Sequence, residues 1–128
     1  MDDEITVFLA KADESLAAAS SEFANGRYNS CANRCYYACF QAAIAGLLRA
    51  EIRPTGRSQQ WGHDFVQAEF VRQLINRRKR YSPELRTVLQ DNLRLRQVAD
   101  YSTDRVTQTQ ARRALGRTNT FVQAIRQD

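Results

Sequence analysis

The sequence predicts an all-α protein that folds as an up-and-down bundle of four to five helices. Apolar residues recur at intervals of three and four over most of the chain, which is the period of a helix. No stretch alternates between apolar and polar residues clearly enough to indicate a strand. Helix caps and helix breakers separate the periodic segments. A single domain spanning residues 1–128 accounts for this length.

The first two predicted helices cover residues 3–24 and 27–50. Asn25 and Gly26 separate them, and this pair typically ends a helix. The second helix is apolar around much of its circumference. Such a helix lies either at the centre of a bundle or in a dimer interface.

Three cysteines, Cys31, Cys35 and Cys39, line one side of the second helix because they recur every four residues. They lack a neighbouring histidine or carboxylate to complete a tetrahedral metal site, and three cysteines do not make a disulfide framework. We interpret them as small apolar residues at a close helix contact. The sequence therefore predicts neither a metal site nor a cofactor.

Residues 51–62 form the long irregular segment of the chain, which we expect to be a mobile basic loop. A third helix is predicted over residues 63–77, with apolar residues at steps of four. The basic run at residues 77–80 ends this helix, where cations suit the negative end of the helix dipole.

The fourth helix is predicted to start at Ser82, with Pro83 in its first position and Glu84 in its first turn. A connector follows at residues 101–106. The segment from Thr107 to Gln110 then matches a capping box for the fifth helix.

Charge is unevenly distributed. Residues 1–25 carry six acids and one lysine, whereas the rest of the chain carries eighteen bases and eight acids. Seventeen of the bases in the chain are arginines, whose planar guanidinium suits phosphates and base edges. This basic excess is compatible with RNA or nucleotide binding, and equally with arginine-rich codon usage and solvated helix faces. The candidate nucleic-acid-binding residues are Arg53, Arg57, Arg77, Arg78 and Arg80.

The first residues, Met1 to Glu4, are acidic, which does not match a secretory signal. No apolar run reaches the roughly 18 residues of a membrane span. We therefore expect a cytoplasmic protein without a membrane partner.

Arg96 and Asp100 continue the face of the fourth helix that carries the core-like Leu89 and Leu93. One interpretation is a simple ion pair between residues four apart. The other is functional: Arg96 is a fixed cation for a phosphate, and Asp100 holds its orientation. Tyr101 places a phenol beside this pair.

His63 is the sole histidine, so imidazole acid–base chemistry would have to use it. Because it follows Gly62 at a helix start, it fits equally well as a helix cap. Tyr36, Tyr37 and Phe40 are interpreted as core and interface packing.

Three segments together resemble a known family. They are YNSCANRCYYACF, GHDFVQAEF and LRLRQVADY, and in this order they resemble a small stand-alone prokaryotic HEPN-domain protein. The resemblance covers nearly the whole chain. It implies a HEPN-like bundle of four or five helices, a homodimer, and pairing with a small MNT-type nucleotidyltransferase as toxin and antitoxin.

The resemblance also implies an activity, because many HEPN proteins are metal-independent endoribonucleases acting on RNA, including tRNA. Their motif is an arginine followed, after four to six residues, by a histidine. Arg96 matches the arginine, but Tyr101 stands where the histidine is expected, and Asp104 and Arg105 are not histidines either. The candidate catalytic residues are Arg96, Asp100, Tyr101 and His63.

The missing histidine leaves alternatives open. The chain can be a non-catalytic module that binds nucleotide, RNA or a nucleotidyltransferase partner, with Tyr101 as the acceptor of a modification. It can also be a structural dimer in which the ionic cluster only fixes the fourth helix.

Overall fold

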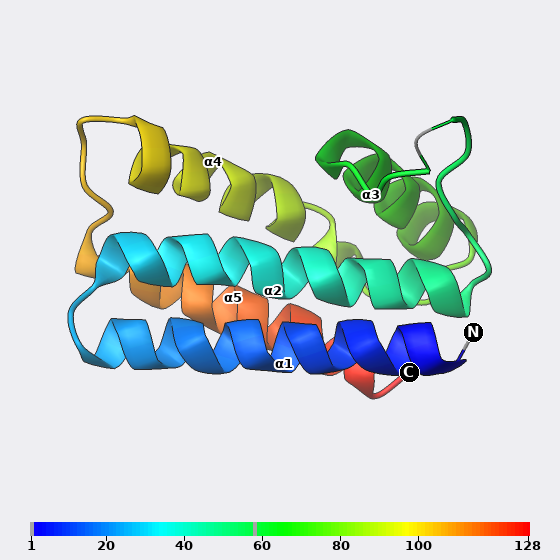
Figure 1. Cartoon of the computed structure of the whole chain (residues 1–128), viewed down its shortest axis with the longest axis horizontal. Helices are drawn as coiled ribbons and strands as arrows, with labels where there is room; N and C mark the ends of the chain where they lie inside the picture. Colours follow the sequence, from blue (N-terminus) through cyan, green and yellow to red (C-terminus); the bar gives the residue numbers. More distant parts are fainter. Residues whose placement is uncertain (1, 58) are drawn as a thin grey trace.

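The computed structural model describes residues 2–57 and 59–128, and this part of the chain contains helices and no strand (Figure 1). The α-helices are α1 (Asp2–Ala24), α2 (Tyr28–Arg49), α3 (His63–Glu69), α4 (Val88–Tyr101) and α5 (Gln108–Arg126). A π-helix (Phe70–Arg77) continues α3, and a 3-10 helix (Pro83–Leu85) precedes α4. The predicted all-α bundle is confirmed.

α2 is the central helix of the bundle. It contacts α1, α5, α4 and α3. In Figure 1, α1 runs along one side of α2, with α5 behind the pair, while α4 and α3 lie on the other side. A helix in this position must be apolar on several faces, which is the pattern that its sequence shows.

The three cysteines of α2 are free and buried in the helix contacts, as predicted. Burial raises the pKa of the Cys39 thiol to about 12, so this thiol is protonated at neutral pH. Its Sγ donates a hydrogen bond to the carbonyl of Tyr36 at 3.3 Å. These properties are those of a packing residue and not of a nucleophile.

Two predicted helix boundaries follow from local chemistry. Gly26 lies in the turn after α1 and has a φ of +75°, a conformation that favours glycine. At the start of α5, the amide of Gln110 donates to Oγ1 of Thr107, and the amide of Thr107 donates to Oε1 of Gln110. The predicted capping box is therefore confirmed.

The predicted start of the fourth helix is wrong. Ser82 does act as a cap, because its Oγ accepts a hydrogen bond from the amide of Glu84 at 3.2 Å. The structure that it caps is the short 3-10 helix, and α4 begins only at Val88. A serine followed by proline marks where a helix starts but not how long it continues. Here the chain turns after the buried Leu85 before α4 begins.

The aromatic part of the core joins three distant segments. The ring of Phe70 lies 5.4 Å from that of Tyr81 and 5.0 Å from that of Phe121. Phe70 and Phe121 are fully buried. This cluster fixes the π-helix and the following turn against α5, at the end of the bundle where both termini lie (Figure 1).

Neither a membrane-spanning helix nor a cluster of metal ligands is found in the described part of the chain. No helix there combines the length and the hydropathy needed to cross a membrane. No group of three or more histidine, cysteine, aspartate or glutamate residues there is placed to hold a metal ion.

Candidate functional site

The centre of the site is an ion pair in the last turns of α4. Nε of Arg96 lies 3.2 Å from Oδ2 of Asp100, so the pair predicted from the spacing is confirmed. The side chains are 21% and 28% exposed, respectively. Both groups are therefore held in place while remaining accessible to a ligand in solvent.

A contact from α2 fixes the carboxylate of this pair. Nδ2 of Asn33 donates to Oδ2 of Asp100 at 3.0 Å. Asn33 is itself oriented, because its Oδ1 accepts from Nη2 of Arg34 at 2.7 Å. Asp100 thus binds partners on two helices, and this restricts the orientation of Arg96.

Two tyrosines of α2 hold the guanidinium of Arg96. Its Cζ lies 5.2 Å from the ring centroid of Tyr36 and 5.3 Å from that of Tyr37. These are cation–π distances. Tyr36 is buried, so its predicted role in the core is confirmed, and its ring also supports the cation. A guanidinium fixed by rings and a carboxylate is preorganised to bind an anion.

The hydroxyl of Tyr36 connects this cation to the histidine. The oxygen lies 3.0 Å from Nδ1 of His63, and Nε2 of His63 lies 3.3 Å from Oε1 of Gln90. Burial raises the pKa of Tyr36 to about 12, so the phenol is protonated and donates to Nδ1. The ring then carries its proton on Nε2, facing Gln90, an assignment that follows from the hydrogen-bond network.

His63 does not cap α3, so that interpretation is wrong. The N-cap residue is Gly62, and no side chain caps this end of the helix. His63 occupies the first helical position, and its ring contacts α2 and α4 instead. The cause is the packing of α3 against α2, which brings Tyr36 within reach of the imidazole.

The four candidate catalytic residues are not all brought together. Arg96, Asp100 and His63 share one network through Tyr36. The side chain of Tyr101 is not part of it: the residue is 76% exposed and ends α4.

An open hollow adjoins the carboxylate of Asp100. Its volume is about 550 Å³, and it lies between α1, α2 and α4. Its lining residues are Ala18, Glu22, Asn29, Ser30, Asn33, Arg34, Ala99 and Asp100. Carboxylates, amides and a hydroxyl can hydrogen-bond to the edges of a nucleobase.

Three residues that were not selected from the sequence make contacts within the candidate site: Asn33, Tyr36 and Gln90. A signal for the first two was present. Asn29, Asn33 and Tyr36 follow each other at helical spacing, which puts polar groups along one edge of an otherwise apolar helix. Gln90 had no comparable signal.

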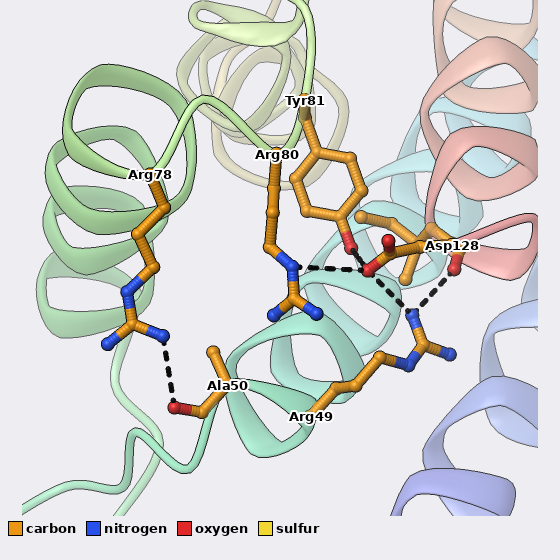
Figure 2. A network of polar contacts seen from close by, with 7 residues as sticks. Arg49, Ala50, Arg78, Arg80, Tyr81 and Asp128 are labelled. Atoms are coloured by element: carbon orange, nitrogen blue, oxygen red, sulfur yellow. Dashed lines mark hydrogen bonds and ion pairs between the residues drawn. The ribbon is translucent and has the colours of Figure 1, made fainter.

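The five arginines proposed to bind nucleic acid have different surroundings. Arg53 forms an ion pair with Glu4 at 2.6 Å, and Arg57 is exposed in the loop. Arg77 ends the π-helix, and its Nη1 lies 3.5 Å from Oε1 of Gln73. Arg78 and Arg80 contact the ends of α2 and of the chain, as Figure 2 shows.

Comparison with known proteins assigns the chain to a family. The family model for the HEPN domain matches residues 5–128, so the chain belongs to the HEPN domain family. It is also similar to the protein named "Putative toxin MJ0605" of Methanocaldococcus jannaschii. The two are 29% identical over 127 residues, which cover 97% of this chain and 87% of that protein.

Proposed function

We propose that this protein is an RNA-directed HEPN toxin that acts in the cytoplasm as a homodimer and cleaves RNA without a metal ion. The similarity to a protein named as a toxin supports the first part of this proposal. The observation that carries the chemistry is the position of Tyr36. It contacts both the guanidinium of Arg96 and the imidazole of His63, so a cation and a proton-transfer group belong to one site.

The proposed reaction is attack of a ribose 2′-hydroxyl on the adjacent phosphorus. Arg96 stabilises the negative charge of the phosphorane, and Asp100 keeps the guanidinium oriented. His63 accepts the proton of the 2′-hydroxyl on Nδ1, its unprotonated nitrogen, once the ring turns away from the hydroxyl of Tyr36. The leaving 5′-oxygen takes a proton from water. The products are a 2′,3′-cyclic phosphate and a strand with a 5′-hydroxyl end. Tyr36 is a positioning residue, because its protonated hydroxyl orients the imidazole.

The outer face of the site favours a homodimer. Tyr37 and Phe40 are only half-buried in the single chain and lie beside the Arg96 contacts. A second copy covering this face would bury their rings and bring two arginine sites together. If the protein is the toxin of a pair, an MNT-type nucleotidyltransferase is the proposed antitoxin.

His63→Ala is expected to lower RNA cleavage by about 100-fold or more, because it removes the proposed proton acceptor. The assay incubates purified dimer with labelled RNA, including tRNA, in the presence of EDTA and resolves the fragments by electrophoresis. Gln97→Ala, at an exposed position of α4, is the control and is expected to cleave normally. Intact RNA after incubation with the unmodified dimer would contradict the proposal.

A second candidate function rests on the exposure of Tyr101. At 76% exposed, its phenol is accessible to another enzyme. In this candidate function, the protein is a binding module that a nucleotidyltransferase modifies. The phenol oxygen of Tyr101 attacks the α-phosphorus of a nucleoside triphosphate held by that enzyme. The attack joins a nucleotidyl group to Tyr101 and releases pyrophosphate.

Co-expression with an MNT-type nucleotidyltransferase is expected to increase the mass of the chain by one nucleotidyl group or more, and Tyr101→Phe is expected to abolish the increase. Intact-mass and peptide mass spectrometry measure it. Tyr28→Phe is the control, since Tyr28 is half-buried against Phe23. An unmodified Tyr101 in the co-expressed protein would exclude this candidate.

A further inference from the structure

A second hollow lies between the end of the π-helix and the 3-10 helix, and we call it the cationic groove. Its volume is about 510 Å³. Its lining residues are Ile75, Asn76, Lys79, Arg80, Tyr81, Ser82, Pro83 and Arg86. None of the contacts of Arg96, Asp100 or His63 involves these residues, so the groove is separate from the site described above.

The charge of the groove is of one sign. Lys79, Arg80 and Arg86 line it, and none of its lining residues is acidic. By contrast, the hollow beside Asp100 contains two carboxylates, which would repel a phosphate. Three cations around one hollow concentrate positive potential and attract a polyanion.

The donors of the groove are available and oriented. The ammonium of Lys79 makes no hydrogen bond or ion pair with any residue that the structure describes. Nη2 of Arg86 donates to Oδ1 of Asn76 at 2.8 Å, which orients the guanidinium and leaves its other N–H groups for a ligand. A point charge beside an oriented guanidinium is a suitable arrangement for phosphate oxygens.

One edge of the groove already binds an anionic oxygen, as Figure 2 shows. Oδ2 of Asp128 accepts a hydrogen bond from the hydroxyl of Tyr81 at 2.8 Å and lies 3.4 Å from Nη1 of Arg49. Arg80 is the weakest partner, with its Nε at 3.7 Å from the same oxygen. Its side chain is 35% exposed, so a second anion can reach it.

We infer that the cationic groove binds the backbone phosphates of single-stranded RNA, and that a phosphate competes with the Asp128 carboxylate for Arg80. RNA as the ligand rests on the proposed function. The position of the groove relative to Arg96 fits this role. Arg86 of the groove lies just before α4, and Arg96 lies about 12 Å along the axis of α4 from the first residue of this helix. A strand held in the groove can therefore extend along α4 to the Arg96 site.

The test measures the affinity of a fluorescein-labelled single-stranded oligoribonucleotide by anisotropy, in an Arg96→Ala background so that the RNA remains intact. Lys79→Ala and Arg86→Ala are each expected to weaken binding by about tenfold. Each is also expected to reduce the slope of log affinity against log salt by about 0.7, the value for one lost phosphate contact on a single strand. Lys11→Ala removes the same charge from exposed α1 and is the matched control. Equal losses in the control and the groove variants would overturn the inference.

The competition with Asp128 has its own readout. Asp128→Asn is expected to raise RNA affinity by up to about fivefold, because the amide no longer pairs with Arg80. Asp104→Asn makes the same charge change at an exposed position of the connector and is expected to have a smaller effect. Thermal unfolding of both variants checks that the fold is intact. Equal effects of the two substitutions would refute the competition.

The outcomes separate this inference from the proposed function. Groove-dependent RNA binding by a protein that never cleaves RNA would support the groove and contradict the nuclease. If the protein cleaves RNA and the groove variants bind RNA as tightly as the unaltered groove does, the nuclease is supported and the groove is contradicted. A free nucleoside triphosphate is added as a competitor of the labelled RNA. It is expected to displace the RNA only at concentrations at which simple salts also do so. Tight binding of the triphosphate that depends on the groove residues would overturn RNA as the ligand.

Discussion

Replacing Arg96 by alanine is expected to lower RNA cleavage by about 100- to 1,000-fold, the cost of removing one preorganised group that stabilises transition-state charge. The structure supports a large effect of this substitution on the cleavage rate and a small effect on the stability of the fold. Arg96 lies on the protein surface at 21% exposure, and its guanidinium is fixed by Asp100 and by the ring of Tyr36. The measurement is single-turnover cleavage of labelled RNA by the purified variant.

Arg94→Ala is the matched control, because Arg94 is on the same helix, 70% exposed, and also pairs with an aspartate, Asp91. It is expected to cleave at nearly the normal rate. Arg96→Lys is expected to recover little activity, since lysine keeps the charge but lacks the planar group that stacks on two tyrosine rings. Full cleavage by Arg96→Ala would mean that the phosphate is held elsewhere.

Asn92→Leu is expected to lower the free energy of unfolding by about 2–4 kcal/mol. Asn92 of α4 is 1% exposed, and its Nδ2 contacts both the carbonyl of Cys35 on α2 and the side chain of Thr118 on α5. Its Nδ2 donates to Oγ1 of Thr118 at 2.8 Å, and its Oδ1 accepts from Nε of Arg117 at 2.7 Å. Leucine would leave a buried hydroxyl and a partly buried guanidinium without these partners.

Denaturant unfolding followed by circular dichroism measures this loss. Gln97→Leu, on the exposed face of the same helix, is the control and is expected to change stability little. Thr118→Val removes the partner hydroxyl. The double variant Asn92→Leu with Thr118→Val is therefore expected to lose less than the sum of the single losses. Additive losses, or a single loss below about 1 kcal/mol, would show that the network does not hold the helices together.

The sequence was informative wherever the cause is local. The predicted helices of residues 3–24 and 27–50 correspond to α1 and α2 within one residue at each end, which is inside the usual uncertainty of a helix end. The Thr107 capping box and the Arg96–Asp100 pair were also predictable, because each involves residues within one turn of a helix. The start of α4 was not, since a cap does not determine the length of the helix after it.

The site was only half predictable. Arg96, Asp100 and His63 could be selected by residue type and position, but the residue that connects them could not. Tyr36 was assigned to packing, and its hydroxyl contact with His63 depends on how α3 crosses α2. Gln90 likewise reaches the site through a partner on another helix, since it contacts His63 of α3.

The sequence by itself determined which segments are helical, which faces are apolar and which charged groups pair along one helix. These properties depend on residues three or four positions apart, whose geometry the helix itself supplies. Only the tertiary structure decided that Asn33 reaches Asp100 across 67 residues, and that Tyr36 lies between Arg96 and His63. Those distances depend on the crossing angles and registers of packed helices, which are set by the shape of the whole core and not by any local repeat.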